Sequence, residues 1–269
     1  MEELYAELCV TSVCASVLQA MHLPLPPEIA PPDPLLTALK AQKLGDRPVD
    51  RVLLYNPDAV ALWLYQKYTT AFAPAALHSD LAVPLRSVMP TVTPVCFASM
   101  YTGVLPEIHG IRKYTKPVLQ TKTLFDYLPA QGRRCAIVST AGDSISKIFL
   151  ERDVDYYIYD EVEQVNEKAL ALIAEDRHDL ITIYNGNYDG AMHRHGPEGA
   201  ESLAALAANL AFYAQLTAAI RRHWRGYDTL YGFCPDHGCH EIDGGCGSHG
   251  LDMTEDMNVI HFYGIRPAE

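Results

Sequence analysis

Five short apolar runs, spaced along the chain from residue 51 onward, constrain the fold more than any other feature of the sequence. The first, Val52-Leu53-Leu54-Tyr55-Asn56, is almost continuously apolar, and the others lie at 134–139, 155–159, 180–184 and 229–233. Such runs are typical of strands that are buried on both faces of a parallel sheet. Segments with helical character separate them, at 59–68, from 93 onward, and at 123–128, 144–150, 162–175 and 201–224. This alternation predicts an α/β fold with a mainly parallel central sheet and helices on both faces.

The first fifty residues have a different character. Residues 3–22 are mostly apolar and predict a helix. Six prolines then crowd residues 24–34, which excludes a helix or a central strand there, and a second helix is predicted at 35–43. We therefore expect residues 1–50 to form an N-terminal helix and a proline-rich strap packed on the core, and residues 51–269 to form one α/β domain.

Composition limits the partners and the compartment. The formal net charge of −12 over 269 residues argues against a nucleic-acid groove or an anionic membrane surface. A local metal site could still attract a small anionic substrate. Seven cysteines, an odd number in a chain too long to need disulfides, indicate reduced thiols and a cytoplasmic location. No apolar run reaches the ~18 residues of a membrane span, and the acidic start Met1-Glu2-Glu3 does not resemble a signal peptide.

Thr93 stands where a helix is predicted to begin. We expect it at the N-cap, with Pro94 at the first helical position, where the missing proline N–H costs nothing. A hydroxyl in this place lies beside free backbone N–H groups and the positive end of the helix dipole, which together favour a phosphate or sulfate group. The alternative is that Thr93 only caps a buried helix.

Candidate metal ligands follow three of the predicted strands. Asp58 comes directly after the first strand, and Asn56 is a weaker candidate for the same role because an amide carries no charge. The later ones are Asp189 and His193, which suit one metal from a tight loop or one helical turn. Asp236 and His237 come next, and His249 follows in the Gly-rich stretch Gly247-Ser248-His249-Gly250. Carboxylate oxygens and imidazole nitrogens are ordinary zinc ligands. Ligands of parallel sheets bind beyond the carboxyl ends of the strands, where these residues are expected.

A competing arrangement uses cysteines. Cys234, Cys239, Cys246 and His249 could form a structural Cys₃His zinc site. Their spacing lacks the tight C-x₂-C pair of most such sites. If this arrangement were present, the chain could be a non-catalytic metal-binding module.

Taken together and in order, these segments resemble the alkaline phosphatase superfamily, and within it the type I phosphodiesterase/nucleotide pyrophosphatase family. The resemblance extends from about Arg51 to the C-terminus. It rests on Pro90-Thr91-Val92-Thr93-Pro94, residues 102–111, the pattern Asp189-x-x-x-His193-x-x-Gly196-Pro197, Asp236-His237-Gly238 and Ser248-His249-Gly250. It implies an alkaline-phosphatase-like catalytic domain over residues 51–269. Because the chain is short for the family, we expect a small or absent cap.

The resemblance also implies a metal centre with two divalent cations, zinc first and Mn or Mg as alternatives. One would be held by Asp189, His193 and His249. The other would be held by Asp58, Asp236, His237 and the oxygen of Thr93. Asp58 is the loosest match, because Ala59 follows it where the family has glycine.

The implied activity is hydrolysis of a small phosphate ester or nucleotide. Thr93 would be the catalytic nucleophile and would form a phospho-threonine intermediate, since metal coordination lowers the pKa of its hydroxyl. Thr91 and Ser99 are the alternative nucleophiles in this segment. A phosphodiester or nucleotide pyrophosphate is the expected substrate; a phosphomonoesterase or a phosphosugar mutase with the same two-metal site are the alternatives. Substrate contacts are expected, from closeness in sequence alone, at Tyr101, Arg112 and Lys113.

Overall fold

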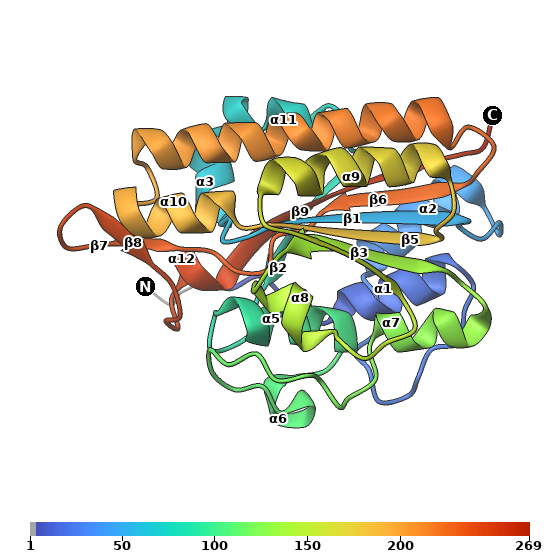
Figure 1. The fold of residues 1–269 in the computed structure, drawn as a ribbon, viewed down its shortest axis with the longest axis horizontal. Coiled ribbons are helices and arrows are strands. Elements are labelled where there is room, and N and C mark those ends of the chain that lie inside the picture. The colour runs from blue at the N-terminus through green and yellow to red at the C-terminus, as the bar shows by residue number, and fades with distance from the viewer. Residues whose placement is uncertain (1–3) are drawn as a thin grey trace.

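The computed structural model describes residues 4–269, which fold around a seven-stranded sheet lying between two layers of helices (Figure 1). The strand order is β2-β9-β6-β1-β5-β3-β4. Pairing is parallel except at β9, which runs antiparallel to both of its neighbours. The strands are β1 (Arg51–Pro57), β2 (Leu81–Arg86), β3 (Cys135–Thr140), β4 (Asp155–Tyr159), β5 (Leu180–Asn185), β6 (Thr229–Phe233) and β9 (Asn258–Arg266). This confirms the predicted α/β fold with a mainly parallel sheet.

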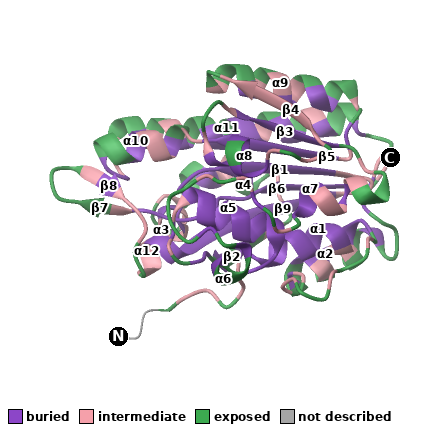
Figure 2. Ribbon diagram, turned by 60° about the horizontal axis from the view of Figure 1, so that its bottom comes forward, coloured by how far each residue is buried: buried purple, intermediate pink, exposed green. Residues whose placement is uncertain are grey.

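Strand β1 lies in the middle of the sheet and supplies both hydrophobic cores. Val52 and Leu54 face one core, and Leu53 and Tyr55 face the other. All four side chains are fully buried, as expected for a continuous apolar run. Figure 2 shows the central strands of the sheet buried, the edge strand β4 less so, and the outer faces of the helices exposed.

The helices divide between the two faces (Figure 1). The first core contains side chains of α1 (Ser12–Ala20), α2 (Pro34–Leu44), α5 (Thr93–Thr102), α7 (Leu124–Tyr127) and α8 (Ser144–Ile148). The second contains those of α3 (Leu62–Lys67), α4 (Ala73–Ala76), α9 (Val162–Glu175), α10 (Asn187–His195) and α11 (Ala200–His223). The remaining short elements are α6 (Pro106–His109), α12 (Thr254–Met257) and the 3₁₀ turns η1 (Thr69–Phe72) and η2 (Pro129–Gln131).

Four strands were not anticipated by the sequence analysis. Two of them, β2 and β9, form the antiparallel edge of the main sheet. The other two, β7 (His240–Ile242) and β8 (Cys246–Ser248), form a separate hairpin. Strand β2 contains Pro84, which is tolerated because β2 lies at an edge of the sheet.

The prediction of a helix over residues 3–22 is wrong outside Ser12–Ala20; residue 3 lies outside the described part of the chain. Residues just before α1 are held in an extended path instead. The backbone N–H of Arg86 donates to Leu8, and the N–H of Val10 donates to Arg86. Pairing with the end of β2 therefore overrides the helical preference of this apolar segment.

The prediction of a helix from residue 59 is also wrong at its start, because α3 begins at Leu62. Ala59 adopts a left-handed conformation with φ 63°, and Ala61 forms an isolated bridge with Val259. Left-handed φ favours glycine. Ala59 therefore keeps a backbone conformation that glycine, which the resemblance implies at this position, would adopt without strain.

The proline-rich segment packs beside α5. The N–H of Ala30 donates to the carbonyl of Gly103 over 2.8 Å. Gly103 ends α5 with φ 76°, and a Cβ built there would lie 2.9 Å from the Cβ of Ile29. Residues 24–34 thus cross the end of the helix that begins with Thr93.

Helix α11 changes one sequence expectation. By length and composition it is apolar enough to cross a membrane, which the sequence analysis did not anticipate for any segment. Buried core helices often have the same length and composition, so these two properties alone do not make α11 a membrane span. Its residues Leu206, Leu210, Tyr213 and Leu216 are buried in the second core. Packing against the sheet therefore explains why this face of α11 is apolar.

Candidate active site and metal centre

The candidate residues lie beyond the carboxyl ends of three neighbouring strands. Asp58 follows β1, Asp189 lies in α10 after β5, and Asp236 follows β6. Strand β1 pairs with both β5 and β6 in parallel. Parallel pairing brings the three strand ends to one edge of the sheet, where α5 presents Thr93.

Asp58, Asp236 and His237 form what we call the buried group. Their ligand atoms all lie within 4.8 Å of one another. His237 Nε2 is 3.3 Å from Asp58 Oδ1 and 3.4 Å from Asp236 Oδ2. Both of these carboxylate oxygens are buried and have no hydrogen-bond partner. Buried charges without partners are costly, so this arrangement calls for a cation.

Asp189, His193 and His249 form the outer group. Asp189 and His193 lie one turn apart on α10, which settles the open alternative in favour of a helical turn. The Nε2 atoms of His193 and His249 are 3.1 Å apart, and lie 3.3 Å and 3.4 Å from Asp189 Oδ1. That oxygen is likewise buried without a hydrogen-bond partner.

The three imidazoles are oriented by backbone carbonyls. Nδ1 of His193 contacts Gly247 O at 3.0 Å, Nδ1 of His249 contacts Thr91 O at 2.8 Å, and Nδ1 of His237 contacts its neighbour Gly238 O at 2.9 Å. A carbonyl only accepts, so each Nδ1 carries a proton, and Nε2 is the ring nitrogen that faces the carboxylates and is available to a metal. Metal-binding histidines are oriented in this way. The donor set of imidazole nitrogens and carboxylate oxygens fits zinc, with Mn²⁺ also compatible.

The two groups are contiguous. The rings of His237 and His249 stack with centroids 4.1 Å apart at 28°. The buried group is nearly inaccessible, and the outer group is partly exposed. Two adjacent ligand sets, one deeper than the other, therefore form a single centre open on one side.

Thr93 faces the buried group. Its Oγ1 lies 3.2 Å from Asp58 Oδ2 and 3.4 Å from His237 Nε2. Thr93 is the first residue of α5 rather than its N-cap, which is Val92, and it makes no capping bond. The predicted N-cap is thus wrong by one residue: Val92 O accepts the first helical hydrogen bonds, and the Thr93 hydroxyl turns to Asp58.

The pKa values of the carboxyl groups are shifted in opposite directions in the buried group and the outer group. Burial, reinforced by the charge of Asp189, raises the pKa of Asp58 to about 7. Burial also raises the pKa of Asp236 well above its usual value and lowers that of His237 to about 3. Burial alone would raise the pKa of Asp189. Hydrogen bonds from the His193 and His249 imidazoles outweigh this effect, so the pKa of Asp189 is lowered. Without cations, the buried group resists carrying its full negative charge.

Comparison with known proteins decides the family. A profile of the family described as type I phosphodiesterase/nucleotide pyrophosphatase matches residues 61–258. The chain belongs to this family. The family match confirms the resemblance inferred from the sequence, and it leaves Asp58 and the first fifty residues outside the matched range. A comparison with curated proteins finds no match.

Two solved structures of the murine ectonucleotide pyrophosphatase/phosphodiesterase 5 share the fold of this family member. Each has a TM-score of 0.57, 16% sequence identity and coverage of 72% of this chain. One is described as an inactive threonine-to-alanine variant in complex with AMP. Coverage of the two murine chains is 58% and 59%, so this family member spans less than two thirds of their length.

Three supporting residues were missed by the sequence analysis. The Tyr184 hydroxyl donates to Asp58 Oδ2 over 2.5 Å, Ser87 donates to Asp236 O over 2.6 Å, and His261 Nε2 donates to Pro235 O over 2.7 Å. Tyr184 ends a predicted strand, and that position was an available signal. Ser87 directly follows β2 and His261 lies in β9, two strands that no local sequence pattern predicted.

The predicted substrate contacts are not brought to the centre. Tyr101 is fully buried in the core, stacks on Phe125, and shares hydrogen bonds with Asn56. Asn56 is itself occupied by backbone carbonyls, so it is not the ligand in place of Asp58. Arg112 donates to Glu107 O from an exposed loop, and Lys113 is exposed beside it. Closeness in sequence to Thr93 was a poor guide, because α5 carries its later turns into the core.

The cysteines do not converge. Cys239 Sγ contacts the Tyr188 hydroxyl in the second core, and Cys246 Sγ contacts Arg194 O. Cys234 is buried in the first core, on the opposite face of the sheet. Within residues 4–269, the only clusters with metal-ligand spacing are the buried and outer groups. The structural Cys₃His site is therefore not formed, and His249 belongs to the outer group.

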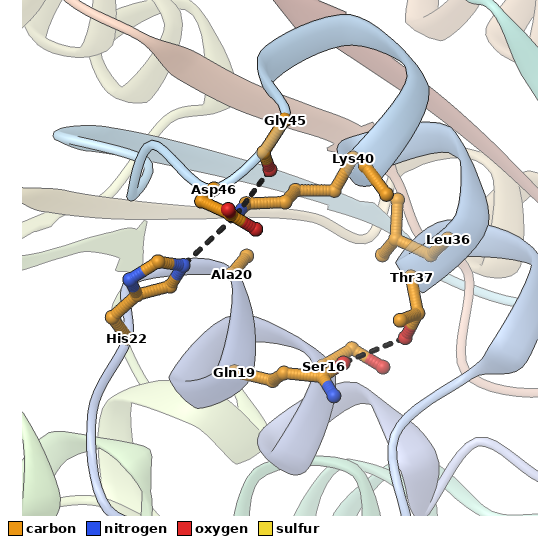
Figure 3. A pocket seen from close by; sticks show the side chains of 10 residues that line it. Ser16, Gln19, Ala20, His22, Leu36, Thr37, Lys40, Gly45 and Asp46 are labelled. Atoms are coloured by element: carbon orange, nitrogen blue, oxygen red, sulfur yellow. Dashed lines mark hydrogen bonds between the residues drawn. The ribbon is translucent and has the colours of Figure 1, made fainter.

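A separate hollow of about 210 Å³ lies between α1 and α2 (Figure 3). Its polar side chains are partly paired with one another: Lys40 Nζ lies 2.9 Å from His22 Nε2 and 3.1 Å from Gly45 O. Thr37 donates to Gln19 across the two helices. Neither Thr93 nor any member of the buried or outer group lines this hollow. Its Gly45 and Asp46 precede β1, whereas Asp58 of the buried group follows that strand, so the hollow and the ligand groups lie at opposite ends of β1.

Proposed function

We propose that this chain is a metal-dependent phosphoester hydrolase of the phosphodiesterase/nucleotide pyrophosphatase type, with Thr93 as its nucleophile. The observation that carries the proposal is the position of Thr93 Oγ1, 3.2 Å from Asp58 Oδ2 and beside two groups of ligands whose buried carboxylate oxygens lack partners. Family membership supports the same reaction class.

The residues would divide between two divalent cations. Asp58, Asp236, His237 and the Thr93 oxygen would hold one, and Asp189, His193 and His249 the other. Bound cations would supply Lewis acidity, lowering the pKa of the threonine hydroxyl and neutralising the phosphate charge. Zinc is the proposed metal, because the ligands are imidazoles and carboxylates.

The chain's own groups orient the nucleophile. Asp58 Oδ2 accepts a hydrogen bond from the Thr93 hydroxyl. This bond directs a lone pair of Oγ1 away from the carboxylate. Thr93 lies at the N-terminus of α5, where the helix dipole favours a negatively charged phosphoryl group. Attack by Oγ1 on phosphorus forms the O–P bond of phospho-threonine as the hydroxyl proton passes to solvent, and the leaving group departs from the opposite side as an alcohol after taking up a proton. Water then attacks the same phosphorus: its oxygen joins the phosphate, the O–P bond to Thr93 breaks, one proton of the water restores the threonine hydroxyl, and a diester substrate leaves as the monoester.

We propose a nucleotide or other small phosphodiester as substrate. The AMP complex of the murine relative supports a nucleotide. Because this chain spans 58% of the first murine chain, segments that contact substrate there need not have counterparts here.

Matched aryl substrates test the proposal. The protein is stripped with a chelator, reloaded with Zn²⁺, Mn²⁺ or Mg²⁺, and assayed on bis(p-nitrophenyl) phosphate and p-nitrophenyl phosphate. We expect metal-dependent turnover with the diester faster. A faster monoester reaction would favour a phosphomonoesterase. Two bound metals with turnover of neither ester would favour a mutase or a non-catalytic metal-binding protein and would end the proposal.

A further inference from the structure

Asp256 lies in α12, outside both ligand groups, and its side chain is fully buried. No lysine or arginine pairs with its carboxylate in the part of the chain that the structure describes. A buried carboxylate needs donors. The origin of those donors gives Asp256 a role beyond packing.

Both donors come from the loops that carry metal ligands. Asp256 Oδ1 lies 2.7 Å from His240 Nδ1, and Oδ2 accepts from the backbone N–H of Leu251 over 2.8 Å. His240 is three residues beyond His237, and Leu251 is two residues beyond His249. One carboxylate therefore bonds to the loop of the buried group and to the loop of the outer group.

The backbone of α12 reinforces the contact with the first loop. The N–H of Gly238, next to His237, donates to the carbonyl of Asp256 over 2.7 Å. A Cβ added at Gly238 would overlap the carbonyl oxygen of Glu255. The loop that carries His237 thus lies directly against α12, with no space for a shift toward the helix.

We propose that Asp256 is a positioning residue that couples the two halves of the metal centre. Displacement of either loop leaves one oxygen of the buried Asp256 carboxylate unpaired, which is costly. A cation that fixes one loop therefore also fixes the Asp256 side chain. The fixed carboxylate in turn holds the other loop in the position that suits its own cation. Coupling of this kind is reciprocal between the two sites. The inference rests on the proposed two-metal centre.

Cobalt titration tests the coupling, because the visible spectrum of Co²⁺ reports its ligands. We define the coupling factor as the affinity of one group when the other is filled, divided by its affinity when the other is disabled. Asp189→Ala disables the outer group, and Asp236→Ala disables the buried group. The factor is measured in the wild-type background and again with Asp256→Asn added.

We expect Asp256→Asn to lower the coupling factor about tenfold, within the usual range of coupling between sites. Repulsion between the two cations contributes equally to both backgrounds and cancels. Asp252→Asn is the matched control: this exposed carboxylate belongs to the same loop and accepts from Tyr5, and its removal leaves the factor unchanged.

The outcomes separate the inference from the proposed function. Two Co²⁺ ions bound with the same coupling factor in wild type and Asp256→Asn overturn the inference alone. A wild-type protein that takes up no Co²⁺ overturns the metal centre and the inference with it. If Asp256→Asn does not fold, His240→Ala replaces it, since this change removes one donor and keeps the carboxylate; an unchanged factor there equally overturns the inference.

Discussion

The phenolic oxygen of Tyr184 lies 2.5 Å from Asp58 Oδ2, the same oxygen that accepts from Thr93. Tyr184 is the last residue but one of β5 and Asp58 comes just after β1, so the bond links two paired strands. The Tyr184 hydroxyl thus fixes the position of Asp58 Oδ2. Because that oxygen also accepts from Thr93, the same bond helps to orient the candidate nucleophile. Tyr184 is therefore a structural determinant of the buried group.

Tyr184→Phe should weaken cation binding by the buried group about 10- to 100-fold, as is usual when a partner of a metal ligand is lost. The measurement is a Zn²⁺ competition titration with the outer group disabled by Asp189→Ala. Tyr101→Phe is the control, because that phenol bonds to Asn56 in the core. Equal zinc affinities for Tyr184→Phe and Tyr101→Phe would contradict the role of Tyr184.

Asp58→Asn should stabilise the metal-free protein at pH 8. Burial and the charge of Asp189 raise the folded-state pKa of Asp58 to about 7, whereas the unfolded value is about 3.9. The folded state then holds a proton that the unfolded state has released, so this carboxyl's contribution to stability declines as pH rises from about 4 to 7. Asparagine avoids the loss, which is on the order of 2–4 kcal/mol. Urea unfolding with a chelator present measures it.

Zinc at 100 times its dissociation constant should narrow that difference in stability. Wild type gains stability by binding, about 2.7 kcal/mol at 100 times the dissociation constant, and Asp58→Asn gains less because one ligand is missing. If the asparagine variant is the less stable protein in chelator at pH 8, the pKa of Asp58 is not raised.

Thr93→Ala should reduce turnover at least ~10³-fold while both cations still bind, because three protein ligands remain in each group. Ser99→Ala is the matched control: its hydroxyl bonds to His109 inside the core. Rates on the diester and metal content by mass spectrometry are measured on the same samples. Full activity in Thr93→Ala would transfer the nucleophile to Thr91.

His261 should give the protein an acid-sensitive stability between about pH 6.5 and pH 4. Burial lowers its pKa to about 4 in the folded state, and the unfolded value is about 6.5. In this window the unfolded state binds a proton that the folded state refuses, so stability falls as pH falls. The loss between pH 7 and pH 5 is about 2 kcal/mol.

His261→Gln should remove that part of the pH dependence. Unfolding free energies at pH 7 and pH 5 give the slope for wild type, for His261→Gln, and for His223→Gln as an exposed control. Identical slopes in all three proteins would show that His261 is not buried as a neutral ring.

The sequence by itself determined the fold class and the set of candidate ligands. Continuous apolar runs such as 180–184 fix a buried parallel sheet, because only strands covered on both faces tolerate them. Parallel strands share one ligand-binding edge, so Asp58, Asp189 and Asp236 could be expected to meet. Only the tertiary structure decided the rest. No local pattern encodes contacts between residues far apart in the chain. Such contacts decide the antiparallel direction of β9, the burial of Tyr101 in the core while Tyr184 bonds to Asp58, and the carbonyls that orient His193 and His249.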